Sequence, residues 1–368
     1  MMRLSFKSCL LSALMATAAL AGVAKAEEDK VVNVYNWEEY IDDTTLADFE
    51  KETGIKVVYS TFDSNDTLEA KILAGKSGYD VVFPSGAFLE RQIKAGAYQK
   101  LDKAKLTNIG NMDPDIMGKV AQFDPGNEHA VDYMWGITGI GYNAAKIKEI
   151  MPDAPIDSWS IIFDPKIAAK FKKCGIAILN APDEVIPAVL KYLGEDPNSK
   201  DPAVIKKALP VLEKIRPFIT RFEGSSMIDK LATGDICLAI AWNGDMFQAK
   251  AAADAAKNGV DVKFSIPKEG AQLWFDSMAI LADAPHPDNA HAFINFMMRP
   301  DIIARNSAST QYANGNAAAK AVMDPAVTSN PGIYPMPETM KTLYLITAYS
   351  QKEQRVLNKI WETIKLAE

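Results

Sequence analysis

Residues 31–59 read VVNVYNWEEYIDDTTLADFEKETGIKVVY, and their pattern sets the fold class. The β-branched run at 31–35 predicts a strand, and 46–53 predicts a helix that ends at Gly54. A second strand is predicted at 55–59. Strands separated by helices of this length indicate a parallel sheet with right-handed crossovers, in which ligands bind at the carboxyl ends of the strands.

The same alternation of strands and helices continues along the chain. Further strands are predicted at 80–83, 176–179, 236–242 and 262–266, and the segment 136–142 is rich in glycine and β-branched residues. Further helices are predicted at 64–73, 89–94, 226–233, 287–298 and 339–365. We expect an α/β protein of two domains, because 368 residues usually outgrow a single core.

The first 26 residues have the features of a secretory signal. Arg3 and Lys7 supply positive charge, an apolar stretch follows, and residues 24–26 (AKA) allow cleavage before Glu27. The alternative is a membrane anchor, but the apolar stretch is shorter than the run of about 20 residues that a bilayer requires. We therefore expect a cleaved signal and a mature chain that is free in the compartment to which it is exported.

The charge of the chain excludes one class of partner. The chain has 40 Lys and Arg residues against 47 Asp and Glu residues, and cleavage of the signal removes three of the basic ones. The mature net charge is then −10, because 37 basic residues face 47 acidic ones. We find no basic run and expect no nucleic-acid partner. If the charge reports on the ligand, the ligand is cationic.

Enzyme and metal motifs are absent from the sequence. There is no G-x-S-x-G elbow, P-loop, H-E-x-x-H or G-x-G-x-x-G pattern, so we expect no catalytic residue and no cofactor. His129, His286 and His291 are too scattered to form a metal site with two mature cysteines. Those cysteines, Cys174 and Cys237, form a disulfide or remain as two buried thiols, and an oxidising compartment favours the disulfide.

Aromatic residues stand beside carboxylates at three predicted strand ends. The groups are Trp37 with Glu38 and Glu39, Trp242 with Asp245, and Trp274 and Phe275 with Asp276. An aromatic face and a carboxylate together suit an alkylammonium ligand, because the ring attracts the cation and the carboxylate accepts its N–H groups. The alternative is that the tryptophans cap the core and that the acids are solvated loop residues.

Several motifs resemble the periplasmic putrescine/spermidine-binding proteins of bacterial ABC importers. They are residues 35–41 (YNWEEYI), 49–57 (FEKETGIKV), 63–65 (DSN), 78–82 (GYDVV), 133–136 (YMWG), 139–143 (GIGYN), 157–159 (DSW) and 330–335 (NPGIYP). The resemblance runs from about residue 30 to the C-terminus. It implies a type II periplasmic binding protein, with two α/β lobes joined by a two-crossover hinge. The implied division is 27–134 and 246–300 for the first lobe, and 135–245 and 301–368 for the second.

The resemblance also implies a set of ligand-binding residues. An aromatic box is expected from Trp37, Trp242, Trp274 and Tyr312, with Tyr40 beside it. The expected carboxylates are Glu39, Glu184, Asp245 and Asp276, and Ser85 is the expected polar wall residue. The disulfide of the family falls on Cys174 and Cys237, in agreement with the argument from the compartment.

The chain departs from the family pattern at several positions of the site. Glu38 stands where a small hydroxyl residue is usual, and Ala87 stands where the putrescine branch often has a serine. Glu39 and Trp274 match the spermidine branch, whereas Ala181 matches the putrescine branch. We expect spermidine to bind at least as well as putrescine, because Glu39 and Trp274 both favour a triamine.

The resemblance implies a monomeric binding protein that captures a polyamine and delivers it to an inner-membrane ABC permease. Another cationic amine, such as agmatine, cadaverine or a cationic amino acid, is the alternative ligand. An alternative of a different class is a periplasmic amine-modifying enzyme. Binding of the unmodified ligand without turnover would discriminate between the two classes.

Overall fold

The computed structural model describes residues 28–367, so the predicted signal at 1–26 lies outside the described residues. The strands are β1 Val31–Trp37, β2 Lys56–Phe62, β3 Val81–Val82, β4 Ala130–Asn143, β5 Ile176–Leu179, β6 Arg221–Glu223, β7 Leu238–Trp242, β8 Val262–Ser265 and β9 Gln272–Ile280. The helices are α1 Thr45–Thr53, α2 Asn65–Leu73, α3 Gly86–Lys94, α4 Pro114–Val120, α5 Ala144–Ile150, α6 Ser160–Phe163, α7 Pro165–Phe171, α8 Pro182–Tyr192, α9 Pro202–Ile205, α10 Ala208–Ile215, α11 Met227–Thr233, α12 Asn243–Ala256, α13 Pro287–Met297, α14 Pro300–Thr310, α15 Pro325–Thr328, α16 Pro337–Met340 and α17 Gln351–Leu366. No helix within 28–367 has the length and apolar character needed to cross a membrane.

The described strands form one sheet in the order β2-β1-β3-β9-β4-β7-β5-β6, and β8 pairs with β4. β1 runs parallel to β2 and β3, as the strand–helix–strand pattern predicts. β5 likewise runs parallel to β6 and β7. β9 and β4 pair with each other in antiparallel fashion and join the two parallel groups.

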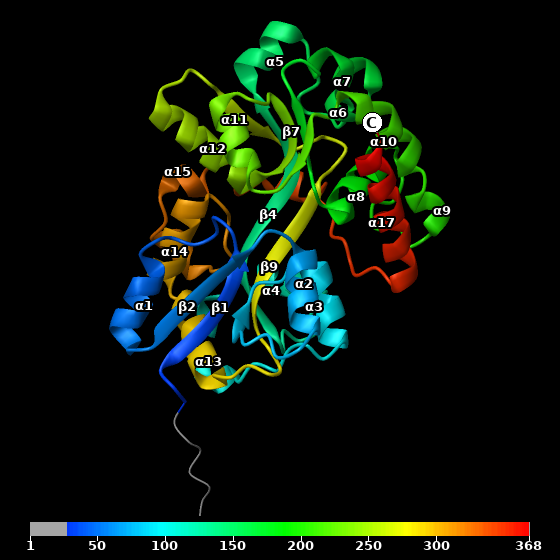
Figure 1. The fold of residues 1–368 in the computed structure, drawn as a ribbon. Helices are drawn as coiled ribbons and strands as arrows, with labels where there is room; N and C mark the ends of the chain where they lie inside the picture. Colours follow the sequence, from blue (N-terminus) through cyan, green and yellow to red (C-terminus); the bar gives the residue numbers. More distant parts are fainter. Residues whose placement is uncertain (1–27, 368) are drawn as a thin grey trace, which may run out of the picture.

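Figure 1 shows that the helices gather into two halves along this sheet. The lower half contains β1–β3 with α1–α4 and α13, and the upper half contains β5–β7 with α5–α12 and α17. β4 and β9 run through both halves, and every residue of β4 is buried. The two long strands therefore form the shared core of the molecule.

The first elements form for the reasons that the sequence suggests. Val32 and Val34 alternate into the core from β1. α1 ends at Gly54, whose φ of 69° lies in the left-handed region that glycine adopts without strain. Ser64 caps α2, because its side chain accepts a hydrogen bond from the backbone N–H of Thr67. These local signals place the end of β1 and the start of α2 at the same edge of the sheet.

The predicted disulfide is confirmed. Cys174 and Cys237 are bonded, and their Cα atoms lie 5.5 Å apart. The bond joins the chain just before β5 to the chain just before β7, two neighbouring strands of the upper half. The alternative of two buried thiols is therefore wrong.

Two expectations differ from the structure. The predicted helix at 339–365 is interrupted, because Tyr344 forms a bridge with Gln272 at the start of β9 and takes up an extended conformation. The sequence-based boundaries also place residues from 246 on in the first lobe. α12 and β8 instead pack in the upper half, where α12 contacts α11 and β8 pairs with residues 140–143 of β4. α12 stays there because it begins directly after β7.

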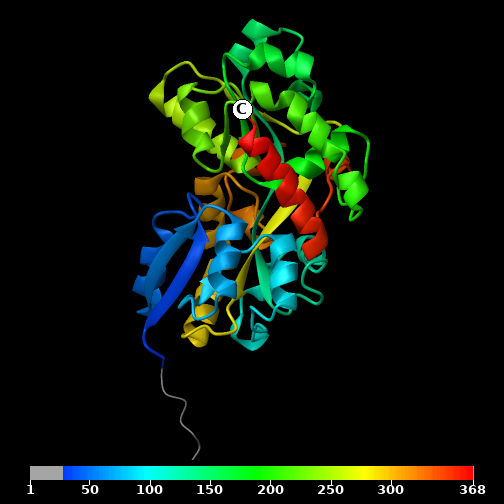
Figure 2. The same ribbon diagram turned by 45° about the vertical axis from the view of Figure 1, so that its right-hand side comes forward.

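The two halves also touch beside α17. Figure 2 shows the start of this helix next to the helices of the lower half. The Ala348 N–H donates to the Glu90 carboxylate at 2.8 Å, and the Arg91 guanidinium donates to the Gln354 side chain at 3.4 Å. These contacts connect α3 to the end of the chain.

Candidate functional site

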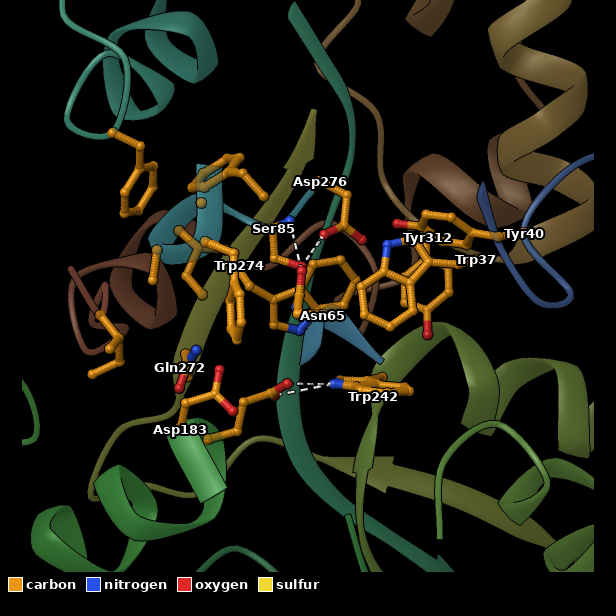
Figure 3. A pocket seen from close by; sticks show the side chains of 18 of the residues that line it. Trp37, Tyr40, Asn65, Ser85, Asp183, Trp242, Gln272, Trp274, Asp276 and Tyr312 are labelled. Carbon is orange, nitrogen blue, oxygen red and sulfur yellow. Dashed lines mark hydrogen bonds between the residues drawn. The ribbon is translucent and has the colours of Figure 1, made fainter. Parts of the chain in front are cut away.

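A pocket lies between the two halves, at the ends of the strands that the sequence singles out. It holds about 670 Å³ of space, part of which is open solvent. Trp37 ends β1, Trp242 ends β7, and Trp274 and Asp276 lie on β9. Figure 3 shows these side chains around a common space. The pocket therefore draws its walls from both halves and from a strand that they share.

Three helices begin at this pocket. Ser85 directly precedes α3, Asp183 and Glu184 lie in the first turn of α8, and Asp245 lies in the first turn of α12. Helix N-termini carry partial positive charge, which stabilises a carboxylate placed in the first turn. The backbone thus supports acidic side chains at the site without bringing a cationic side chain into it.

Aromatic rings form much of the wall. The rings of Trp37 and Trp242 lie 6.1 Å apart at 72°, and those of Trp274 and Tyr312 lie 5.3 Å apart at 63°. Tyr40 packs against Tyr312 at 5.2 Å. The Trp37 indole N–H donates to the Phe83 carbonyl at 2.9 Å, which fixes its orientation. These contacts pack the rings of the wall against one another and against the backbone.

Two glycines make room for these rings. A Cβ on Gly244 would lie 2.4 Å from the ring of Tyr312, and a Cβ on Gly136 would lie 2.4 Å from the ring of Trp274. Contacts this short require the ring to move. Glycine at both positions thus lets the backbone of α12 and β4 approach the aromatic wall.

Asp276 is held by a short chain of polar side chains. The Ser85 hydroxyl donates to its carboxylate at 2.5 Å, and the Asn65 amide donates to the Ser85 oxygen at 2.9 Å. Burial raises the pKa of Asp276 to about 7, and the hydroxyls of Ser85 and Tyr40 offset only part of this effect. Asp276 therefore lacks the donors that would keep it ionised.

Asp245 has a similar environment on the other side of the wall. The Tyr312 hydroxyl donates to its carboxylate at 2.6 Å. Burial raises the pKa of Asp245 to about 7, the Tyr312 hydrogen bond lowers it, and the charge of Glu39 raises it. A cation beside Asp245 would supply the missing counter-charge.

Glu184 and Asp183 form a third acidic position at the start of α8. The Trp242 indole N–H donates to both oxygens of Glu184, at 3.0 and 3.1 Å, and the Thr138 hydroxyl donates to one of them. Burial raises the pKa of Glu184, and the charge of Asp183 raises it further. Burial also raises the pKa of Asp183. The nearby charge of Asp66 raises the pKa of Asp183 further, and the charge of Arg91 lowers it.

The acids of the pocket have no cationic neighbour in its wall. Five carboxylate residues line it, and no Lys, Arg or His is among the described residues that do so. Uncompensated carboxylates beside aromatic faces suit an organic cation that carries several N–H donors. Within residues 28–367, no group of three or more His, Cys, Asp or Glu side chains could hold a metal ion.

Most of the site residues expected from the resemblance line this pocket. They are Trp37, Glu38, Tyr40, Ser85, Glu184, Trp242, Asp245, Trp274, Asp276 and Tyr312. Glu39 is the exception, because it is exposed, has a backbone φ of 52° and is not a lining residue. Glu38, the unusual residue of this region, lines the pocket in its place. Their roles as ligand contacts remain predictions.

Sequence reasoning missed four polar residues of the wall, namely Asn65, Asp183, Ser225 and Gln272. Asn65 stands at the start of a helix and in the family-like motif 63–65, but its contact with Ser85 joins two segments that no single motif connects. Asp183 stands beside Glu184 in the first turn of α8, so adjacency to a predicted ligand residue was the available signal. Gln272 lies at the start of β9, where the sequence shows no marker of a site.

The chain is similar to known binding proteins along most of its length. The sequence pattern of the bacterial extracellular solute-binding protein family matches residues 44–335. The putrescine-binding periplasmic protein SpuD of Pseudomonas aeruginosa is 51% identical over 356 residues, covering 96% of this chain and 97% of that protein. The putrescine-binding periplasmic protein PotF of Escherichia coli is 48% identical over 360 residues, covering 96% of this chain and 97% of that protein.

A solved structure supports the same relationship. The spermidine/putrescine ABC transporter substrate-binding protein PotD of Streptococcus pneumoniae matches with a TM-score of 0.74 at 29% identity, covering 92% of this chain and 99% of that chain. The match confirms the expected α/β fold of a periplasmic binding protein. The relatives confirm the expected periplasmic location and a solute-binding protein in place of an amine-modifying enzyme. The chain belongs to the bacterial extracellular solute-binding proteins, in the group of the periplasmic putrescine- and spermidine/putrescine-binding proteins.

Proposed function

We propose that this protein captures a linear polyamine, putrescine or spermidine, in the periplasm and delivers it to an inner-membrane ABC permease. The observation that carries the proposal is the wall of the pocket, where five carboxylate residues meet aromatic side chains without a Lys, Arg or His among the described lining residues. A polyamine has the complementary chemistry, because its charged ammonium groups alternate with apolar methylene segments. The names of the relatives support the same class of ligand.

The proposed binding mode divides the ligand between rings and acids. The methylene segments pack between Trp37, Trp242 and Trp274, and the ammonium groups donate to Asp245 and Asp276. An ion pair at about 4 Å is worth about 1 kcal/mol in water and about 4 kcal/mol at an effective dielectric constant near 20. Enclosure between the halves therefore strengthens each ion pair.

We further propose that the two halves act as lobes and that β4 and β9 form the hinge between them. Both strands pass through each half and pair with each other along their length, so a change of angle between the halves must bend them. A monomer with both halves exposed to the permease is sufficient for delivery. Light scattering of the mature protein with and without ligand tests the monomer directly.

Titration calorimetry of ligand-stripped mature protein tests the proposed function. The panel consists of putrescine, spermidine, cadaverine, agmatine, lysine and arginine at one pH and ionic strength. We expect saturable binding of putrescine or spermidine with one site per chain. Tighter binding of agmatine, cadaverine or a cationic amino acid would replace the proposed ligand, and no binding of any amine would reject the function.

A further inference from the structure

Gln272 is a buried polar residue of the pocket that the aromatic and acidic wall leaves unused. It is 8% exposed and lies at the start of β9, where its backbone is in register with Thr138 of β4 and bridges to Tyr344. Its side-chain oxygen is buried and has no hydrogen-bond partner among the described residues. A buried amide oxygen without a donor destabilises a protein, so its place in a pocket wall calls for a ligand.

Asp183 is the acid that lies with Gln272. Both residues line the pocket, α8 packs against β9, and Figure 3 shows the two side chains next to each other. No described side chain donates a hydrogen bond to the Asp183 carboxylate, which is half-buried. A neutral acceptor and a carboxylate thus face the same space, and both lack a donor from the protein side chains.

This position is separate from the acids that hold the proposed diamine. In Figure 3, Trp274 lies between Asp276 and Ser85 on one side and Gln272 and Asp183 on the other. Asp276 already accepts a hydrogen bond from the Ser85 hydroxyl. The side-chain oxygens of Gln272 and Asp183 are instead available to a ligand group that extends beyond the indole of Trp274. A primary ammonium group carries three N–H donors and can satisfy both acceptors at once.

We propose that Gln272 and Asp183 form an outer subsite that receives the terminal ammonium group of a polyamine arm extending past Trp274. This inference rests on the proposed function and names the ligand class more narrowly as a triamine of the spermidine type. Gln272 is the specificity-determining residue, since it contributes an acceptor without adding another buried charge. A diamine that ends at Trp274 does not reach this subsite.

The test compares three ligands that differ only in the arm. Putrescine lacks it, spermidine carries an aminopropyl arm, and N-propylputrescine carries the same arm without its terminal nitrogen. We expect the wild-type protein to bind spermidine about tenfold more tightly than N-propylputrescine. The Gln272→Leu variant, which keeps the size of the side chain, should lose this difference and retain the affinity for putrescine within twofold.

The Asp183→Asn variant should reduce the difference in affinity between spermidine and N-propylputrescine. The matched control is Gln248→Leu. Gln248 is a half-buried glutamine of α12 that donates to the Thr310 carbonyl and does not line the pocket. Its replacement should leave all three affinities unchanged. The ligand series on wild-type protein keeps the inference testable even if Gln272→Leu does not fold.

The outcomes separate the inference from the function on which it rests. Equal affinity of the wild-type protein for spermidine and N-propylputrescine would overturn the outer subsite and leave polyamine binding intact. An equal loss for putrescine and spermidine in Gln272→Leu would place Gln272 in the shared part of the site and would also overturn the inference. Failure of the wild-type protein to bind any of the three ligands would reject both proposals.

Discussion

Two buried carboxylates of the molecule, Asp80 and Asp276, have different surroundings. Asp80, at the start of β3, accepts hydrogen bonds from Asn33 at 2.7 and 3.2 Å and contacts the backbone and ring nitrogens of His286 at 2.6 and 3.1 Å. Asp276, in the pocket, accepts a hydrogen bond from the Ser85 hydroxyl and has the Tyr40 hydroxyl nearby. Both are nearly inaccessible to solvent, with 0% and 5% exposed. The protein therefore supplies several donors to the structural acid Asp80, and we propose that the ligand supplies the missing donors of Asp276.

The largest effect is expected when the carboxylate charge of a pocket acid is removed. Asp276→Asn and Asp245→Asn should each weaken polyamine binding by about 2–5 kcal/mol, because the ammonium group keeps its desolvation cost and loses its counter-charge. The free energy of unfolding of the ligand-free variants should stay equal or rise, since a buried carboxyl is replaced by a neutral group. Calorimetry and denaturant unfolding measure the two quantities.

A wild-type affinity in both variants would show that these acids do not contact the ligand. A large loss of stability would place Asp245 and Asp276 in the same class as Asp80.

The reciprocal change is Asp80→Asn, for which we expect a loss of about 2 kcal/mol in the free energy of unfolding. The new amide would bring N–H donors toward those of Asn33 and His286, so at least one buried donor would lose its acceptor. Polyamine affinity of the folded variant should be unchanged. Urea unfolding measures the stability of the variant, and calorimetry measures its affinity for the polyamine. A lower affinity at unchanged stability would contradict the comparison.

The effect of pH sharpens the comparison further. The pKa values of Asp245 and Asp276 are raised from 3.8 to about 7 in the ligand-free protein, whereas alkylammonium groups stay charged to about pH 10. Affinity should therefore fall by about tenfold for each carboxyl as the pH decreases from about 8 to about 6. Calorimetry in buffers of different ionisation enthalpy should also detect proton release on binding at neutral pH.

The same shifts set the sign of the effect of pH on folding stability. Between about pH 4 and pH 7 the folded, ligand-free protein keeps protons that the unfolded chain has released, so the contribution of these groups to stability decreases as the pH rises. Saturating ligand should raise the melting temperature more at pH 8 than at pH 5.5. An equal rise in melting temperature at pH 8 and pH 5.5 would mean that Asp245 and Asp276 are already ionised in the ligand-free protein.

The smallest expected effect concerns the ring beside the acids. Trp274→Phe should lower spermidine affinity by about 1 kcal/mol and putrescine affinity by less, because the indole offers the longer ligand a larger stacking surface. The indole N–H of Trp274 has no hydrogen-bond partner among the described residues, so its removal adds no further cost. Competition calorimetry measures the difference, and an equal loss for both ligands would contradict it.

Local signals explain why the fold was predictable. Glycines and capping residues end the first helices, and apolar runs mark the strands that they separate, so the alternation could be followed from β1 to β3. The interruption between α16 and α17 was not predictable, because it depends on the pairing of Tyr344 with a strand more than seventy residues earlier. Periodicity along the chain contains no information about such a partner.

The candidate site was predictable in part for the same reason. Trp37, Trp242 and Trp274 carry a signal that is visible in the sequence, an aromatic residue beside an acid at a strand end. Glu39, which has a positive φ, does not line the wall, and the inclusion of Gln272 depends on where β9 crosses between the halves. Both are consequences of tertiary structure, which neighbouring residues do not encode.

The placement of the tryptophans gives the protein an intrinsic optical reporter. Of its six tryptophans, Trp37, Trp242 and Trp274 line the pocket, whereas Trp135, Trp159 and Trp361 are buried elsewhere with at most 6% exposed. A ligand that enters the pocket changes the dielectric surroundings and quenching of the first three indoles and leaves the others as a constant background. Fluorescence emission can therefore follow binding in rapid mixing experiments without a label. Single Trp→Phe variants would show how much of the signal comes from each of the three pocket tryptophans.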